Sequence, residues 1–266
     1  MRSKFLIWAL AFIITAGSVV FQRMTGPSYP VTGAIEIDNH RVEFYLPRTY
    51  ENTSPARAVI ETADENITGT IHWRRYKSHD EVTIDTLERS GSQLIGIIPP
   101  QPAAGKVVYD VFLNDKNGNS AALAGEPVII RFRDPVPTVF LVPHMVFMSL
   151  AMLLSTWCGL AAIAGRENLA PRVILTAVLT FLGGLIFGPI VQKYAFGALW
   201  TGWPLGHDLT DNKTAVAMIF WLMAIWRMKA GRHGRAWVIT ASIVTFVIFL
   251  IPHSLLGSEL DYTEME

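Results

Sequence analysis

Five apolar stretches constrain the fold of this chain more than any other feature of its sequence. A helix that crosses a bilayer needs about 20 mostly apolar residues. The stretches cover residues 5–21, 138–164, 173–191, 215–226 and 236–251. The fourth is the shortest, and it reaches roughly 15 residues if it begins at Asn212, with tilt as a further allowance. Four such runs in succession are not explained by a soluble core, so the sequence predicts a membrane α-helical bundle with five transmembrane helices.

The first stretch can be interpreted as an anchor or as a signal peptide. Arg2 and Lys4 precede it, as they would in either case. Its length of about 17 residues exceeds the ~7–15-residue apolar core of a signal peptide. Residues 15–17 form a poor cleavage site because the bulky residues 19–21 follow them. We favour an uncleaved anchor over a removed signal, and both interpretations export the segment that follows.

Residues 29–134 have a different pattern, in which apolar and polar residues alternate. Period-two alternation with β-branched and aromatic residues is typical of strands. The pattern occurs in residues 34–38, 41–46, 70–76, 93–98, 106–113 and 127–132, and turn-forming residues separate the runs. Six or seven short strands predict an inserted all-β sandwich over 29–134. It would lie between an anchor domain, 1–28, and a four-helix domain with an acidic tail, 135–266.

Part of this segment resembles a known kind of domain. A tryptophan-bearing strand, a proline-rich turn, a second aromatic strand and a polar glycine turn follow one another at residues 71–76, 97–102, 108–111 and 114–119. In this order they resemble a bacterial immunoglobulin-like or fibronectin type III-like domain. The chain has one cysteine, so the disulfide of antibody domains is absent. The resemblance implies a sandwich that contacts partners or acts as a spacer, and the fold alone does not identify a function.

The charges balance, with 22 basic and 22 acidic residues, but they are separated along the chain. Basic residues favour short cytoplasmic loops. Eight of them precede the first span or lie in the loops after the second and fourth: Arg2, Lys4, Arg166, Arg172, Arg227, Lys229, Arg232 and Arg235. The segment between Ile35 and Asp134 holds 15 acidic and 11 basic residues, and the C-terminal tail is acidic.

This separation predicts an orientation and excludes one class of partner. We expect a multi-pass protein of a bacterial-type inner (plasma) membrane, in contact with membrane lipid. Its N-terminus would be cytoplasmic, and the sandwich, the loop 192–212 and the C-terminus exterior. The net acidic sandwich gives no electrostatic reason to bind nucleic acid.

With this orientation, three histidines fall at the outer membrane face. His144 and His253 each follow a proline near the end of a span, and His207 lies in the exterior loop beside Asp208. Polar groups at membrane depth are costly and suggest function, and imidazole is a common ligand of transition metals. One hypothesis is therefore a transition-metal site formed by His144, His207, His253 and Asp208, with Asp211 as an alternative carboxylate.

Three other interpretations of these residues remain open, and one of them is that the histidines handle protons or a substrate. His144 and His253 could be axial ligands of haem b, with Trp203 packed against the ring. Alternatively, the roles are structural, because histidine and tryptophan suit the headgroup zone and Asp208 or Asp211 can cap a helix.

The sequence contains no nucleophile elbow, phosphate loop or zinc-protease helix, so it does not indicate an enzyme. We expect an accessory or scaffold protein whose sandwich contacts an exported protein partner through residues 31–134. The alternatives are a redox subunit that uses the outer-face histidines, and a small transporter with Gly183-Gly184 as its hinge. We otherwise interpret these glycines as close-packing residues, and Cys158 as an inert thiol in the core.

Overall fold

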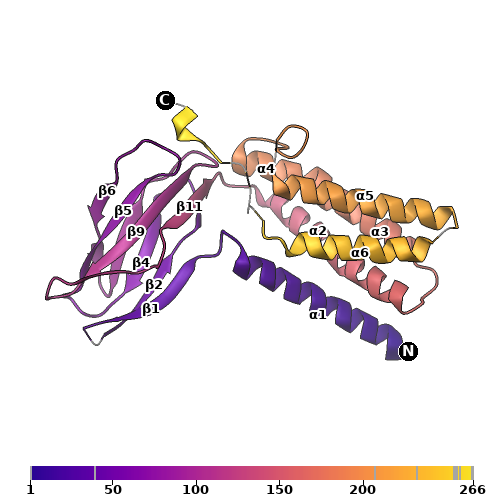
Figure 1. Ribbon diagram of the computed structural model, residues 1–266, viewed down its shortest axis with the longest axis horizontal. Helices are drawn as coiled ribbons and strands as arrows, with labels where there is room; N and C mark the ends of the chain where they lie inside the picture. The colour runs from indigo at the N-terminus through magenta and orange to yellow at the C-terminus, as the bar shows by residue number, and fades with distance from the viewer. Residues whose placement is uncertain are drawn as a thin grey trace. The chain divides into compact units, whose positions relative to one another are not determined.

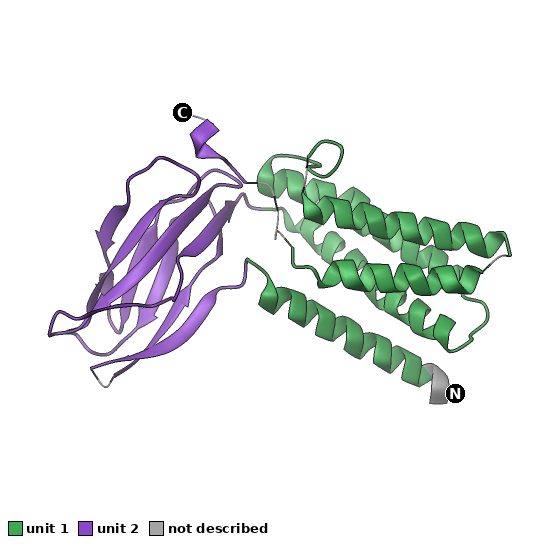
Figure 2. Cartoon of the chain, in the orientation of Figure 1, with its two compact units in different colours: residues 1–27, 136–257 green, residues 28–135, 258–266 purple. Residues whose placement is uncertain are grey.

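A computed structural model describes residues 2–38, 40–206, 208–231, 233–253, 257 and 259–264. The chain divides into two compact units (Figure 2). The helical unit comprises Met1–Pro27 and Val136–Gly257, and the β unit comprises Ser28–Pro135 and Ser258–Glu266. The C-terminal tail, which the sequence analysis groups with the helices, therefore belongs to the unit built of strands.

The β unit contains two sheets (Figure 1). The first has the strand order β1-β2-β4-β8-β7 and the second β3-β11-β9-β5-β6, with β10 paired to β9. Neighbouring strands are antiparallel except for β3 and β11, which are parallel. The strands are β1 (Val31–Ile37), β2 (His40–Leu46), β3 (Thr49–Glu51), β4 (Ala56–Glu61), β5 (Thr68–Arg75), β6 (Thr83–Thr86), β7 (Glu88–Ser90), β8 (Gln93–Ile98), β9 (Lys106–Asn114), β10 (Ser120–Ala122) and β11 (Val128–Arg133).

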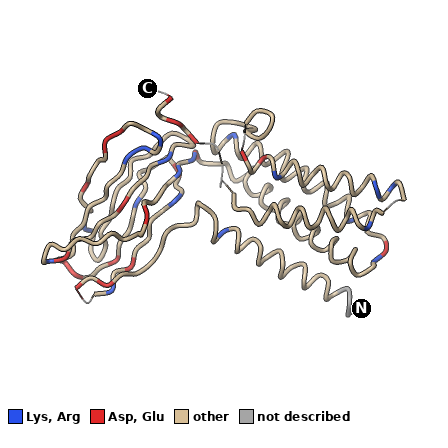
Figure 3. The backbone as a smooth tube through the Cα atoms, viewed as in Figure 1, with Lys and Arg blue, Asp and Glu red and all other residues tan. Residues whose placement is uncertain are grey.

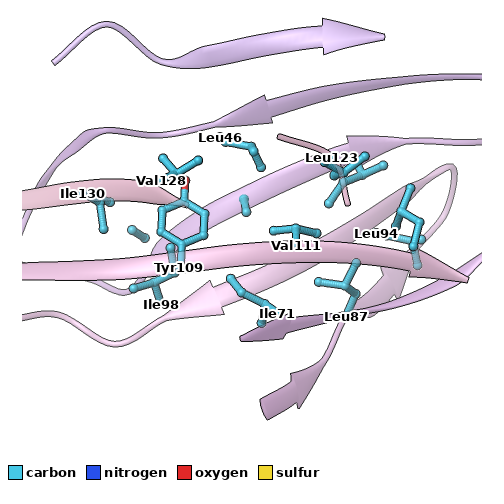
Figure 4. Close-up of a cluster of buried hydrophobic side chains, with 14 of the residues drawn as sticks. Leu46, Ile71, Leu87, Leu94, Ile98, Tyr109, Val111, Leu123, Val128 and Ile130 are labelled. Carbon is cyan, nitrogen blue, oxygen red and sulfur yellow. The ribbon is translucent and has the colours of Figure 1, made fainter. Parts of the chain in front are cut away.

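The two sheets share one hydrophobic core (Figure 4). Every second residue of β8, β9 and β11 is buried, because successive side chains of a strand point to opposite faces. Tyr109 and Phe132 are among the largest fully buried side chains. The Tyr109 hydroxyl donates a hydrogen bond of 2.8 Å to the Pro47 carbonyl, so its polar atom is satisfied inside the core.

All six strands predicted from alternation are present. The prediction missed β4, which lies at the centre of the first sheet between β2 and β8. Its inward positions include Ala56 and Ala58, whose small side chains weaken the apolar signal although both are fully buried. It also missed the four shortest strands, β3, β6, β7 and β10, each of three or four residues.

The helical unit is built from α1 (Arg2–Thr25), α2 (Thr138–Ile163), α3 (Ala170–Thr180), α4 (Gly188–Phe196), α5 (Leu209–Lys229) and α6 (Gly234–Leu250). A π-helical turn, η1 (Phe181–Phe187), joins α3 to α4 without a break. Among the residues that the structure describes, three helices are long and apolar enough to cross a membrane: Phe5–Thr25, Thr138–Ile163 and Ala170–Phe196.

The predicted total of five spans is not confirmed. Helix α6 has 17 residues, which is short for a span. Helix α5 has 21 residues, but Asp211 and Lys213 lie near its start, and Arg227 and Lys229 near its end. Figure 3 shows that the charges of the helical unit gather near the ends of its helices. Length and composition therefore establish three candidate spans.

Small residues allow the helices to pack closely. Gly159 of α2 faces Ser242 of α6, whose hydroxyl donates a 2.9 Å hydrogen bond to the Ser155 carbonyl. Trp221 of α5 is fully buried and its indole N–H donates to Thr245 of α6 at 3.0 Å. Small side chains and interhelical hydrogen bonds are the usual means of helix association in membranes, where lipid is as apolar as leucine.

Candidate functional site

Buried polar side chains gather at the first turn of α5. Asp208, Asp211, Lys213 and Thr214 are all less than 9% exposed. The helix begins here because Asp208 is its N-cap, with the carboxylate accepting the Thr210 N–H at 2.7 Å. Aspartate and lysine are almost never this buried unless they are paired. Asp208, Asp211 and Lys213 each have such a partner.

Asp211 holds the loop that precedes α5. One carboxylate oxygen, Oδ2, accepts the N–H groups of Thr201 at 2.7 Å and Gly202 at 3.0 Å. The next residue, Asn212, accepts the Trp203 N–H through Oδ1 at 2.7 Å. A Cβ at position 202 would lie 2.7 Å from Asn212 Oδ1 and from Asp211 Cβ, so glycine is needed for this close approach. Asp211 and Asn212 therefore fix the loop by binding its backbone.

Lys213 binds the C-terminal end of α6. Its ammonium donates a 2.8 Å hydrogen bond to the Ile251 carbonyl. Gln22 of α1 donates to the same segment, to the carbonyls of Phe249 at 2.6 Å and Ile251 at 3.2 Å. The last carbonyls of a helix have no partner within the helix, and an apolar environment offers no water in its place. Lys213 and Gln22 supply the missing donors.

His144 of α2 binds the π-helical turn. Its Nδ1 lies 2.8 Å from the carbonyl oxygen of Gly183, which also accepts the Gly188 N–H. Because a carbonyl only accepts hydrogen bonds, Nδ1 carries the proton, and Nε2 is the nitrogen that could take a ligand or a second proton. Single π-turns inside α-helices are frequent at functional sites. This contact places one predicted site residue beside an irregular backbone segment.

Of the predicted site residues, His253 interacts electrostatically with two others. His253, which follows the end of α6, lies within electrostatic reach of His144, Asp208 and Lys213. Trp203 is 76% exposed, and its carbonyl accepts the Trp200 indole N–H at 3.2 Å. His207 lies outside the described residues. Among the residues described, no group of three or more histidine, cysteine, aspartate or glutamate side chains is arranged to hold a metal ion.

Two contributors to this end of the helical unit were missed by the sequence analysis. Gln22 lies just beyond the first apolar stretch, and Lys213 lies just beyond the exterior loop 192–212. The sequence did contain a signal for Lys213, because it lies within the first turn of a predicted span. A charged side chain at that depth needs a partner such as another charge or a backbone carbonyl. Gln22 has no comparable signal, since its partners lie 227 and 229 residues away in the sequence.

No protein-family model matches the chain, and no curated protein matches it. Asp208, Asp211 and Lys213 each bind backbone groups that would otherwise lack partners. The imidazoles of His144 and His253 are the groups through which this end of the helical unit could bind a ligand or carry a proton.

Cys158 provides a test of helix packing. Its side chain is fully buried, and its sulfur lies 3.9 Å from the hydroxyl oxygen of Thr176 on α3. We expect a maleimide reagent to leave the folded protein unlabelled and to label it fully after denaturation in SDS, because reaction requires an accessible thiolate. Mass spectrometry gives the labelled fraction. Labelling of the folded protein at the rate of a free thiol would contradict the packing of α2 against α3.

Proposed function

We propose that this chain is an integral membrane protein whose helical unit anchors an immunoglobulin-like β-sandwich, and that the sandwich binds a protein partner outside the membrane. One observation carries the proposal. The β unit encloses a core of its own, whereas the helical unit exposes large apolar side chains, such as Phe5 at 78%, Val139 at 66% and Ile163 at 66%. Exposing that apolar surface to water would be unfavourable, whereas contact with lipid would not be.

In the proposed topology α5 and α6 complete five spans. The N-terminus is cytoplasmic, in a bacterial-type inner membrane, and the sandwich and C-terminus are exterior. The distribution of basic residues supports this orientation. The tail also supports it, because residues 259–264 pack on the β unit. If the tail and the strands share one side, the chain between them crosses the membrane an even number of times.

The strand order supports the immunoglobulin-like assignment. The orders β2-β4-β8-β7 and β11-β9-β5-β6 correspond to the ABED and GFCC′ sheets of that fold, with β1 as an additional edge strand. Besides the missing disulfide, a second feature differs from antibody domains. Trp73, on the strand that would be C, is half-buried, and its indole N–H donates to Asp85 at 2.8 Å.

The edge strand β6 is the surface of the sandwich best suited to a partner. All four of its residues are exposed. Ile84 presents an apolar side chain at 60% exposure, and so does Val82, just before the strand, at 54%. Among the described strands β6 pairs only with β5, so its other edge presents backbone donors and acceptors. Such an edge can bind an extended segment of another protein by adding a strand.

A photocrosslinking experiment tests this surface. We expect a crosslinking amino acid at position 84, in cells that express the full chain, to give one discrete adduct. The exposed position 65 serves as the control and should give none. Val82→Lys should reduce the adduct at least fivefold without changing the folded protein, because a charge disfavours an apolar contact. The absence of an adduct specific to position 84, or an adduct unchanged by Val82→Lys, would contradict the proposed surface.

A second candidate function is a redox subunit. The observation that favours it is the electrostatic proximity of His253 to His144 and Asp208 at one end of the helical unit. Haem b or a transition metal could then be bound by the histidines. Its test is the absorption spectrum and elemental composition of the purified protein. A Soret band or a stoichiometric metal that is lost in His144→Ala and His253→Ala would support this candidate, and its absence would count against it.

A further inference from the structure

The last described residues of the chain form part of the β unit. We call residues 259–264 the C-terminal clasp. Tyr262, at the start of the short helix η2 (Tyr262–Glu264), is only 4% exposed. The guanidinium of Arg75 lies 4.6 Å from the centre of its ring, and its hydroxyl donates to Gln101 Oε1 at 3.1 Å. A buried tyrosine with a cation on its face and a partner for its hydroxyl is bound in a specific way.

Glu259 makes the charged contacts of the clasp. Its carboxylate pairs with the ammonium groups of Lys77, at 2.5 Å, and Lys106. Partial burial acts to raise the pKa of Glu259, but the hydrogen bonds from Lys106 and Lys77 outweigh it and hold the pKa below its usual range. The carboxylate therefore stays ionised at neutral pH, with a lysine on each oxygen.

Backbone hydrogen bonds join the clasp to the sandwich as well. The N–H groups of Tyr262 and Thr263 both donate to the Lys77 carbonyl, at 3.0 and 3.2 Å, and the Leu260 N–H donates to the Ala104 carbonyl at 3.3 Å. A Cβ at position 105 would overlap the Tyr262 hydroxyl, so the glycine there leaves room for the ring. The surface is complementary to the clasp in shape as well as in charge.

Arg75 is held in position by a second ion pair. Its guanidinium makes two 2.7 Å hydrogen bonds to the two carboxylate oxygens of Asp80, and these bonds lower the pKa of Asp80 to about 2. A bidentate pair of this kind fixes the plane of the guanidinium. The Tyr262 ring therefore meets a cation whose position does not depend on the clasp.

We propose that the sandwich carries a binding site for an acidic, tyrosine-bearing peptide segment, formed by Arg75, Lys77, Gln101, Gly105 and Lys106, and that the chain's own C-terminal clasp occupies it. Eight residues separate Leu250, the end of α6, from Glu259. A ligand on so short a tether has an effective concentration in the millimolar range, which keeps a weak site occupied. The inference rests on the proposed topology in one respect: the tail and the sandwich must share a side of the membrane.

The test uses the full chain in lipid nanodiscs, with Cys158→Ala to remove the native thiol and a spin label at Glu264→Cys. Position 264 is exposed, so the label itself does not fill the site. We expect a slow-motion spectrum in the parent protein. Glu259→Lys and Tyr262→Ala should each convert most of the signal to fast motion. Glu126→Lys, which makes the same charge change at another exposed position of the sandwich, should leave the spectrum unchanged.

A rescue experiment and a competition experiment distinguish specific binding of the clasp from a general loosening of the protein. Lys106→Glu combined with Glu259→Lys restores an opposite-charge pair and should recover at least half of the slow component. A free peptide of residues 257–266 at millimolar concentration should release the clasp, and a scrambled peptide of the same composition should not. Fast motion in the parent protein, or a slow spectrum that survives both single substitutions, would overturn the proposal.

A failure of the topology is distinguishable from a failure of the clasp. In vesicles of uniform orientation, a membrane-impermeant reductant should quench spin labels at positions 65 and 264 from the same side. Quenching from opposite sides would refute the topology and the clasp together. Quenching from the same side, combined with fast motion at position 264, would refute the clasp and leave the proposed function intact.

Discussion

Replacing Asp211 by alanine is expected to lower the free energy of unfolding of the helical unit by about 2–4 kcal/mol, because two backbone N–H groups lose a charged acceptor in a buried setting. The affected donors are those of Thr201 and Gly202, where the loop before α5 packs against that helix. The midpoint of thermal unfolding in detergent measures the loss, and the fluorescence of Trp200 and Trp203 reports on the loop.

Two further variants provide losses of stability with which that of Asp211→Ala can be compared. Asn212→Ala removes one neutral acceptor, that of the Trp203 N–H, and should cost only about 0.5–1.5 kcal/mol. Asp211→Asn keeps an acceptor oxygen without its charge and should fall between the two. If Asp211→Ala is no more harmful than Asn212→Ala, the carboxylate does not hold the loop as the geometry indicates.

Replacing Gly159 by leucine is expected to separate α2 from α6 and to destabilise the helical unit by about 3 kcal/mol, near the upper end of the cost of overpacking. A Cβ at this position would lie 2.7 Å from Ser242 Cβ and would collide with the Ser242 hydroxyl. The substitution would also disturb the hydrogen bond from that hydroxyl to the Ser155 carbonyl. The rate of proteolysis of the protein in detergent should rise together with the fall in the unfolding midpoint.

Gly17→Leu is the matched control for this substitution. Gly17 lies in α1, in a segment proposed to cross the membrane, and no atom of the described residues lies within 4 Å of a Cβ built there. The same increase in volume should therefore be tolerated, with little change in the unfolding midpoint. Equal damage from the two substitutions would mean that glycine is needed for a reason other than the contact between α2 and α6.

The candidate site shows the limits of prediction from sequence. His144 and His253 were singled out because they lie at the ends of apolar runs, and His253 interacts electrostatically with His144 and with Asp208. The partners that the structure gives these residues are mostly backbone groups. Asp211 was weighed as a helix cap or a ligand, yet it accepts the N–H groups of a loop ten residues upstream. Backbone donors carry no sequence signal, so these pairings could not have been read from residue types.

The sequence alone determined the alternation of apolar, strand-forming and again apolar segments, because hydrophobic periodicity is a local property that each stretch of chain carries by itself. It determined the separation of basic loops from an acidic sandwich and tail for the same reason. Only the tertiary structure decided which distant groups meet: Lys213 and Gln22 at the end of α6, His144 at the π-turn, and the C-terminal clasp on the sandwich. Contacts between residues 38 to 229 positions apart depend on how the elements pack, and no local pattern encodes that packing.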